Sequence, residues 1–255
     1  AATSQKPYSV LNALEYHYTH QNANVHRGVH FLADQADQAY EKARTRVAGY
    51  LGAERPQEVI FVRGTTEAIN LVAECFLAPR IRPGEVILLT LMEHHANIVP
   101  WQRVAARTGA HLQWVPVTPL GELDLDACEA LFRAHPVRLF AFTQVSHVLG
   151  TVNPLERLVQ LAQSYGAAVM VDGAQAAVHS PAKVAQWGVD FYAFSGHKTL
   201  GPTGIGVLYG KSAWLAEMPP YQSGGGMIEQ VTCQGSTFAM PPGRFEAGTP
   251  PIAQA

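Results

Sequence analysis

The sequence predicts an α/β fold in which a mostly parallel sheet is sandwiched by helices. Short segments that are apolar along their whole length alternate with longer segments of helical periodicity, a pattern typical of sheets covered on both faces. Connections between such strands are right-handed, which makes most of the sheet parallel. The chain has 255 residues, of which 47% are hydrophobic and 15% are charged. Enough apolar area is therefore available to offset the entropy of ordering one large domain, residues 1–255.

The first part of the chain is predicted to be helical. Residues 7–18 carry apolar side chains at helical spacing, with Pro7 in the first turn. Residues 31–51 are rich in Ala with Gln, Glu, Lys and Arg interspersed, and we expect this helix to end at Gly52.

From residue 58 onward, short apolar runs alternate with helical segments. The predicted strands are 58–62, 85–89, 112–117, 137–142, 167–171, 189–194 and 205–209. The predicted helices between them are 67–77, 99–108, 125–133 and 154–165. Residues 219–243 are rich in Gly and Pro, and we expect a hairpin-like excursion there, not a linker between domains.

The composition excludes several classes of protein. Three cysteines are too few, and odd in number, for a disulfide scaffold. With 18 basic and 20 acidic residues, the net charge of −2 gives no basic surplus for nucleic acid or an anionic membrane. No apolar run reaches the roughly 18 residues of a transmembrane helix, and no secretory signal is visible. We therefore expect a cytoplasmic protein with neither a nucleic-acid nor a membrane partner.

Ligands of such sheets bind beyond the carboxyl ends of the strands, so polar residues there are candidate site residues. Thr65 and Thr66 place hydroxyls beside unpaired N–H groups at a helix start, which suits an anion or an ordinary N-cap. His94 and His95 follow another strand, where an imidazole can face a flat ring, ligate a metal or cap a turn. No metal-ligand spacing such as HExxH or CxxC occurs in the sequence, so we expect no metal.

Two further strand ends carry charged residues. Asp172 is costly at the mouth of a buried strand unless it caps a turn or meets a cation, and Gln175 would face the same cavity. Lys198 is either a surface lysine or a Schiff-base nucleophile. Ser195 and His197 precede it without Walker A spacing, and the later Gly-Pro-Thr-Gly-Ile-Gly string is a weak dinucleotide signal.

Together these groups complement one molecule, pyridoxal 5′-phosphate (PLP), which carries an aldehyde, a pyridine ring, a phenolate and a phosphate. Lys198 would condense with the aldehyde, and Asp172 would stabilise a protonated ring nitrogen. Gln175 would donate to the phenolate, and His94 would stack on the ring. The groups expected to hold the phosphate are Thr65, Thr66, Ser195 and His197.

The sequence resembles the cysteine desulfurases of the class V aminotransferase family, in the SufS/CsdA-like branch. The strings that carry the likeness are NVHRGVH (24–30), RGTTEAINLVA (63–73), EHHANIVPWQ (93–102), VDGAQAAVH (171–179), DFYAFSGHKTLGPTGIGVLYG (190–210) and RFEAGTP (244–250). The resemblance implies the large domain of a fold-type-I PLP-dependent transferase, a homodimer, and the residue roles given above. It also implies that Thr249 reaches the phosphate in the partner subunit, and that His26, Arg27 and His147 approach substrate.

The activity implied by the resemblance is removal of sulfur from L-cysteine, with Lys198 taking the Cα proton. The products are L-alanine and an enzyme persulfide, which serves sulfur transfer to an acceptor protein and iron–sulfur cluster assembly. The alternatives are a selenocysteine lyase acting on L-selenocysteine, another class V activity, or a non-enzymatic PLP-binding regulatory or dimerisation module.

The sequence departs from the family pattern in two respects. The family's sulfur-accepting Cys and carboxylate-binding Arg lie in a C-terminal small domain that this chain lacks, and among its own cysteines only Cys233 is expected to be exposed. We therefore expect a large-domain fragment, truncated at both ends and inactive alone. The family also has Asn where this chain has His147, and an imidazole is bulkier and can ionise.

Overall fold

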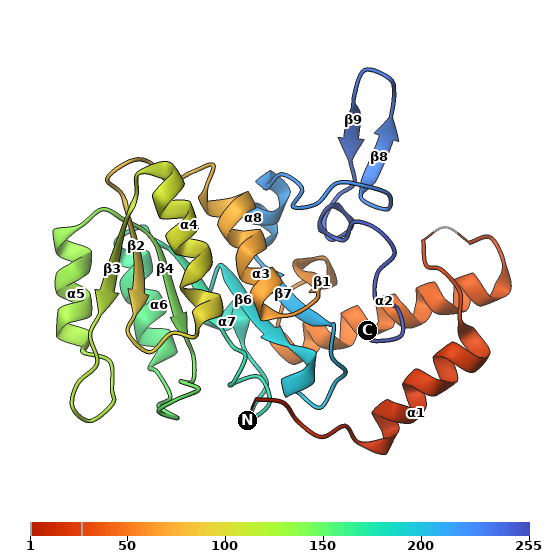
Figure 1. Ribbon diagram of the computed structural model, residues 1–255, viewed down its shortest axis with the longest axis horizontal. Coiled ribbons are helices and arrows are strands. Elements are labelled where there is room, and N and C mark those ends of the chain that lie inside the picture. The colour runs from red at the N-terminus through yellow and green to blue at the C-terminus, as the bar shows by residue number, and fades with distance from the viewer. Residues whose placement is uncertain (1, 27) are drawn as a thin grey trace.

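The computed structural model describes residues 2–26 and 28–255 and is built around a seven-stranded sheet (Figure 1). Its strands are β1 (Val59–Val62), β2 (Val86–Thr90), β3 (His111–Val115), β4 (Val137–Thr143), β5 (Ala168–Asp172), β6 (Phe191–Ser195) and β7 (Gly206–Gly210). They are arranged in the order β1-β7-β6-β5-β4-β2-β3. Within this sheet β7 is antiparallel to both neighbours, and the remaining pairings are parallel. The predicted, mostly parallel sheet is confirmed.

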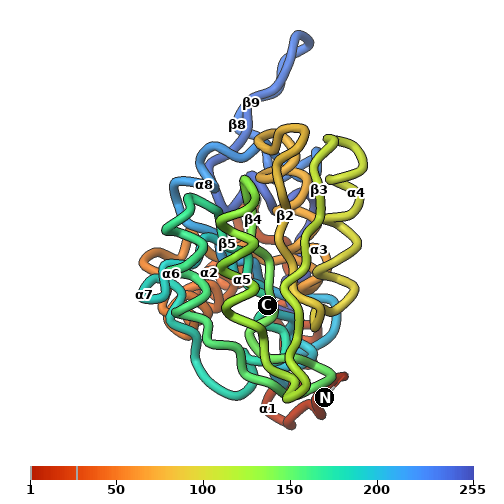
Figure 2. Tube along the Cα trace, turned by 90° about the vertical axis from the view of Figure 1, so that its left-hand side faces the viewer, coloured from red at the N-terminus to blue at the C-terminus, as the bar shows by residue number. Residues whose placement is uncertain are grey.

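Helices cover both faces of the sheet. They are α2 (Phe31–Leu51), α3 (Thr65–Leu71), α4 (Val99–Thr108), α5 (Leu125–Ala134), α6 (Leu155–Ser164), α7 (Val184–Trp187) and α8 (Ser212–Glu217). A further helix, α1 (Tyr8–Tyr16), belongs to neither hydrophobic cluster. One hydrophobic cluster joins the sheet to α2, α5, α6 and α7, and another joins it to α3, α4 and α8. Figure 2 shows α6 and α4 on opposite sides of the strands. Across the described ranges, no helix combines the length and the apolar character that a membrane crossing requires.

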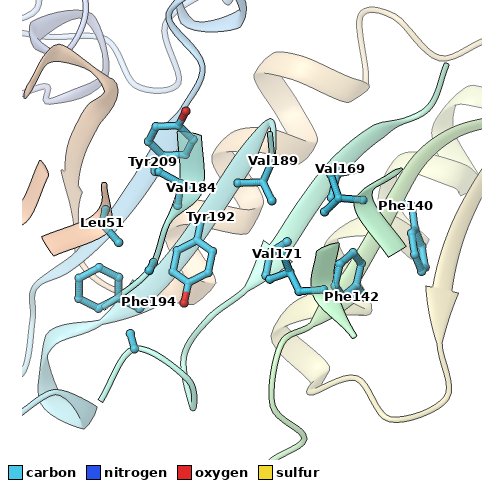
Figure 3. Packing of buried hydrophobic residues seen from close by; sticks show 14 of the residues in the cluster. Leu51, Phe140, Phe142, Val169, Val171, Val184, Val189, Tyr192, Phe194 and Tyr209 are labelled. Carbon is cyan, nitrogen blue, oxygen red and sulfur yellow. The ribbon is translucent and has the colours of Figure 1, made fainter. Parts of the chain in front are cut away.

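Burial on both faces explains why most of the strands are apolar along their length, whereas the edge strand β3 contains His111 and Gln113. Val59 and Phe61 of β1 belong to the first cluster, whereas Ile60 and Val62 belong to the second, because successive side chains point to opposite faces. In the first cluster, side chains from neighbouring strands lie in one layer with Leu51 at the end of α2 (Figure 3).

The N-terminal helix differs from the prediction at both of its ends. Pro7 has an extended ψ of 153° and is the N-cap, so it lies outside the first turn where it was expected. Past Tyr16 the chain continues as a π-helix over His17–Gln21, beyond the predicted end at residue 18. The helix α1 itself has no buried residue. By contrast, α2 has the predicted bounds and ends at Gly52, whose φ of 64° is the left-handed conformation that glycine adopts readily.

The Gly- and Pro-rich segment after α8 contains an antiparallel hairpin of β8 (Ile228–Val231) and β9 (Ser236–Phe238). All residues of both strands are exposed, and the hairpin projects from the rest of the chain (Figure 1). The hairpin is a separate two-stranded sheet and is not part of the seven-stranded sheet.

Candidate active site

A cavity of about 440 Å³ lies at the carboxyl ends of the strands. It is formed by segments that follow β1, β2, β4, β5 and β6, which run in the same direction and therefore end at one edge of the sheet. Its lining residues are Ala2, Thr65, Thr66, His94, Ala96, Thr143, His147, Asp172, Ala174, Gln175, Ser195, His197 and Lys198. Most of the candidate residues from the sequence therefore meet in one place.

Three candidate residues do not line this cavity. Thr249 borders two other hollows formed with the segment around Glu246. His26 lies in the second of these and has its Nδ1 at 3.2 Å from Oδ1 of Asp37. Arg27 lies outside the described residues.

Asp172 combines the two roles that its sequence position allowed. The residue is 4% exposed, and its Oδ1 accepts the N–H of Ala174 at 2.9 Å, so it caps the turn after β5. It also lines the cavity beside Lys198. Burial raises the pKa of the Asp172 carboxyl, while the Ala174 bond and the charge of Lys198 lower it. A buried carboxylate favours a nearby cation, so a cation in the cavity would be stabilised there.

Lys198 is held in a short 3-10 turn, Gly196–Lys198, that directly follows β6. The carbonyl oxygen of His197 accepts the backbone N–H of Ser4 at 2.9 Å and Nζ of Lys6 at 3.1 Å. The N-terminal segment is thus fastened to the turn that carries Lys198. Because the side chain of Lys198 is half-buried and lines the cavity, it is not an ordinary surface lysine.

His94 caps a turn and lines the cavity as well. Its Nδ1 accepts the N–H of Ala96 at 3.1 Å, so the proton of the neutral imidazole resides on Nε2. The His147 ring contacts it edge-on, with 5.0 Å between ring centroids. Burial, followed by the neighbouring His147 and Lys198, lowers the pKa of His94. A neutral aromatic ring is therefore presented to the cavity at neutral pH.

The expected phosphate-binding residues divide into two kinds. Ser195 Oγ accepts the N–H of Thr65 at 2.9 Å and lies 2.9 Å from the Thr65 hydroxyl. These two buried residues thus join the start of α3 to the end of β6. Thr66 is exposed, and His197 is half-buried with a pKa lowered by burial and then by Lys198 and Lys6. Thr66 and His197 are the groups of this set that are better placed to meet an anion.

A close backbone contact brings α3 to this edge of the sheet. A Cβ added at Gly206 would lie 2.5 Å from Cα of Gly64 and 2.7 Å from the carbonyl oxygen of Phe194. Both neighbours are backbone atoms, so they have to move if the side chain is to fit. The position therefore requires glycine, because the backbones of Gly64 and Phe194 leave no room for a side chain.

Replacing Gly206 with alanine should destabilise the protein by about 1–3 kcal/mol, because an overpacked site forces the backbone apart. Urea unfolding of Gly206→Ala measures this change. A matched control is Gly49→Ala in α2, where an added Cβ meets nothing within 4 Å and should stabilise the helix by about 0.5–1 kcal/mol. Equal stability of Gly206→Ala and wild type would contradict the close contact.

The three cysteines are all outside the cavity lining. Cys75 and Cys128 are buried, and burial raises the pKa of each thiol to about 12. Cys233 is exposed between the two hairpin strands, as expected. The cavity therefore contains no thiol from this chain.

Sequence reasoning missed the buried polar residues around the cavity. Thr143 ends β4 and lines the cavity, and the buried Glu93 and Asn97 lie behind His94. A polar residue directly after an apolar run was the available signal for Thr143. No local signal distinguishes the buried Glu93 from an exposed acidic residue.

Known proteins match the whole chain. Residues 1–255 match the family model described as "Aminotransferase class-V". "Probable cysteine desulfurase 1" of Mycobacterium leprae is 51% identical over 255 residues, which are 100% of this chain and 42% of that protein. The crystal structure of the cysteine desulfurase CsdA from Escherichia coli has a TM-score of 0.92 and 45% identity, covering 99% of this chain and 63% of that chain. A structure of C-DES with glycine covalently linked to the PLP cofactor has a TM-score of 0.83 and 26% identity. The match covers 99% of this chain and 66% of that chain.

The chain is shorter than the proteins it matches. It spans from 37% to 62% of the length of the curated relatives. The chain is therefore similar to one part of each of those proteins and not to their whole length.

Proposed function

Since the chain belongs to the class V aminotransferase family, we propose that it is the cofactor-binding part of a PLP-dependent cysteine desulfurase. The observation that carries this proposal is the placement of Lys198, Asp172 and His94 around one cavity. The relatives named as cysteine desulfurases and the PLP in the C-DES structure support it.

The cavity residues fit the cofactor by the chemistry of their donors and acceptors. The buried Asp172 carboxylate suits a protonated ring nitrogen, and the neutral His94 ring suits stacking on the pyridine face. Lys198 would bind the aldehyde carbon, and Gln175 would donate to the phenolate oxygen. The phosphate would be held by Thr66 and His197, which Thr65 and Ser195 position.

The bound cofactor would supply an electron sink for the carbon next to the substrate amine. Nζ of Lys198 would then act as the base that takes the Cα proton of L-cysteine. His94 would cover one ring face and keep water from it. His147 lies beside His94 at the cavity and would contact the substrate.

The products would be L-alanine and a persulfide on an acceptor thiolate. Cys75 and Cys128 are unsuitable acceptors, since burial keeps their thiols protonated and away from the cavity. We place the acceptor thiolate in another part of the whole protein, and onward transfer to a cytoplasmic sulfur-acceptor protein that serves iron–sulfur cluster assembly.

A homodimer would account for the position of Thr249. This residue does not line the cavity of its own chain, and it lies on the segment around Glu246. In the proposed dimer Thr249 reaches the phosphate in the partner subunit. His26 and Arg27 would approach the substrate at the entrance of the active site.

The test is to incubate the full-length protein with PLP, reduce it with borohydride and map the labelled peptide. We expect the label on Lys198, together with alanine formation from L-cysteine in the unreduced protein. Label on a different lysine, or PLP-loaded protein that produces no alanine from L-cysteine, would contradict the proposal.

A further inference from the structure

A buried carboxyl lies directly beside the candidate site, and none of the roles proposed above uses it. Glu93 precedes His94 in the chain and is 7% exposed. We infer that Glu93 is a positioning residue, which fixes the turn that carries His94 relative to the strand that carries Asp172. This inference rests on the proposed function, in which His94 and Asp172 hold the ring of PLP.

Three donors from different elements converge on the Glu93 carboxyl. The hydroxyl of Thr90, the last residue of β2, donates to Oε1. The N–H of Thr143, the last residue of β4, donates to the same oxygen at 3.0 Å. Nδ2 of Asn97 donates to Oε2 at 2.7 Å. All three partners are buried, so removal of the carboxyl would leave polar groups without partners away from water.

Asn97 is itself held in a single orientation. Its Oδ1 accepts the indole N–H of the fully buried Trp101 at 2.9 Å, so its Nδ2 has to face Glu93. The backbone N–H of Asn97 donates to the carbonyl oxygen of His94 at 2.7 Å. The turn from His94 to Asn97 is therefore anchored from beneath by Glu93 and Trp101.

The same network reaches Asp172 through β4. Thr143 and Asp172 are partners in the β4–β5 register. The next residue, Gln144, donates its N–H to the carbonyl oxygen of Asp172 at 2.9 Å. The hydrogen bond that the N–H of Thr143 donates to Glu93 therefore connects the His94 turn with the strand edge that holds Asp172. Such supporting bonds set the precision of a site.

Glu93→Gln keeps the size of the side chain and changes its hydrogen bonding. Each carboxyl oxygen can accept a hydrogen bond whether or not Glu93 is protonated, but the NH₂ of Gln can only donate, so either the N–H of Thr143 or Nδ2 of Asn97 faces a second donor. Thr90→Val is a milder variant, because it removes only the hydroxyl that donates to Glu93.

Asp190→Asn is the matched control. Asp190 is also buried, at 6% exposure, and it too accepts from three donors, which are the N–H of Val169, Nζ of Lys211 and Nε1 of Trp214. It directly precedes β6, so it lies at the opposite end of the strand from Ser195 and the cavity. A loss of stability alone should affect Glu93→Gln and Asp190→Asn in the same way.

The experiment uses the full-length protein and measures urea unfolding, PLP affinity by absorbance titration, and the visible circular dichroism of bound PLP. We expect both Glu93→Gln and Asp190→Asn to unfold at lower urea. Glu93→Gln, unlike Asp190→Asn, should weaken PLP binding by about tenfold or more and reduce the dichroism signal. Thr90→Val should lower the PLP affinity and the dichroism signal as well, by smaller amounts. If Glu93→Gln and Thr90→Val have the same PLP affinity and dichroism as Asp190→Asn, the inference about Glu93 is overturned and the proposed function stands. Wild-type protein that fails to bind PLP would overturn the proposed function and this inference with it.

Unfolding measured over a series of pH values provides a second test. If Glu93 only filled space, the stability difference between wild type and Glu93→Gln would not depend on pH. Burial raises the pKa of Glu93 to about 8; its three hydrogen bonds lower it, and the charge of Asp172 adds to the rise. A carboxyl with a raised pKa keeps its proton in the folded state, so its contribution to stability is complete below the unfolded value of 4.5 and is lost as pH rises through about 8. The stability difference between wild type and Glu93→Gln should therefore narrow from pH 5 to pH 8. A constant difference would contradict burial of this carboxyl beside Asp172.

Discussion

Replacing Lys198 with alanine should reduce alanine formation from L-cysteine by at least about 10²–10⁴-fold, the contribution of a general base. The loss should be larger in practice, because the covalent attachment of PLP goes with it. Lys198 is the one lysine that lines the cavity in the described part of the chain. The nearby Lys6 directs its Nζ to the carbonyl oxygens of Ser4 and His197, at 2.6 and 3.1 Å, and is not positioned to replace it.

Two measurements separate catalysis from binding in Lys198→Ala. Alanine is quantified by chromatography, and bound PLP is measured before and after dialysis. Asp172 and His94 remain in the variant, so we expect PLP to bind reversibly and to be lost on dialysis, without a label after borohydride treatment. Lys6→Ala serves as the control and should keep its borohydride-stable PLP. Turnover by Lys198→Ala within tenfold of wild type would rule out the proposed role of this amine.

The fold was predictable because its signals are local. Most strands of the sheet are buried on both faces and are therefore largely apolar; β1 shows this with four buried residues in succession, and the edge strand β3 is the exception. The site followed from a rule of topology, since parallel strands end at one edge and bring residues such as Asp172 and Lys198 together. Neither conclusion needed knowledge of side-chain contacts.

The supporting contacts were not predictable, because they join residues that are far apart in the sequence. Glu93 becomes buried only when β4 supplies the N–H of Thr143, which is 50 residues away. The pairing of Thr65 with Ser195 spans 130 residues, and it joins the start of α3 to the end of β6. Pro7 was predicted in the first turn, and this prediction was wrong, because its extended ψ makes it the N-cap.

Removing the carboxylate of Glu246 should destabilise the protein by about 3 kcal/mol, because the buried guanidinium of Arg44 loses its buried partner and keeps only the ion pair with the partly exposed Glu41. Arg44 of α2 is 1% exposed, and its Nη1 and Nη2 donate to the two oxygens of Glu246 at 2.7 and 2.9 Å. Glu246 also accepts the N–H of Phe61 at 2.7 Å and the hydroxyl of Tyr40 at 3.2 Å. Urea unfolding of Glu246→Ala measures the loss. The exposed pair of Arg133 with Glu129 is the control, and Arg133→Ala should leave the stability almost unchanged.

A double variant distinguishes the cost of an unpaired charge from the net contribution of the ion pair. Arg44→Met removes the buried cation and keeps an unbranched apolar side chain against Phe61, over which the guanidinium lies at 4.7 Å. Adding it to Glu246→Ala should therefore restore part of the lost stability, since most of the single-variant effect comes from leaving Arg44 with only the partly exposed Glu41 as a charged partner. Fully additive losses in the double variant would mean that the two side chains act independently. Because Glu246 also anchors the segment that carries Thr249, the proposed contact with the partner subunit's phosphate requires this ion pair, and Glu246→Ala should weaken PLP binding as well as folding.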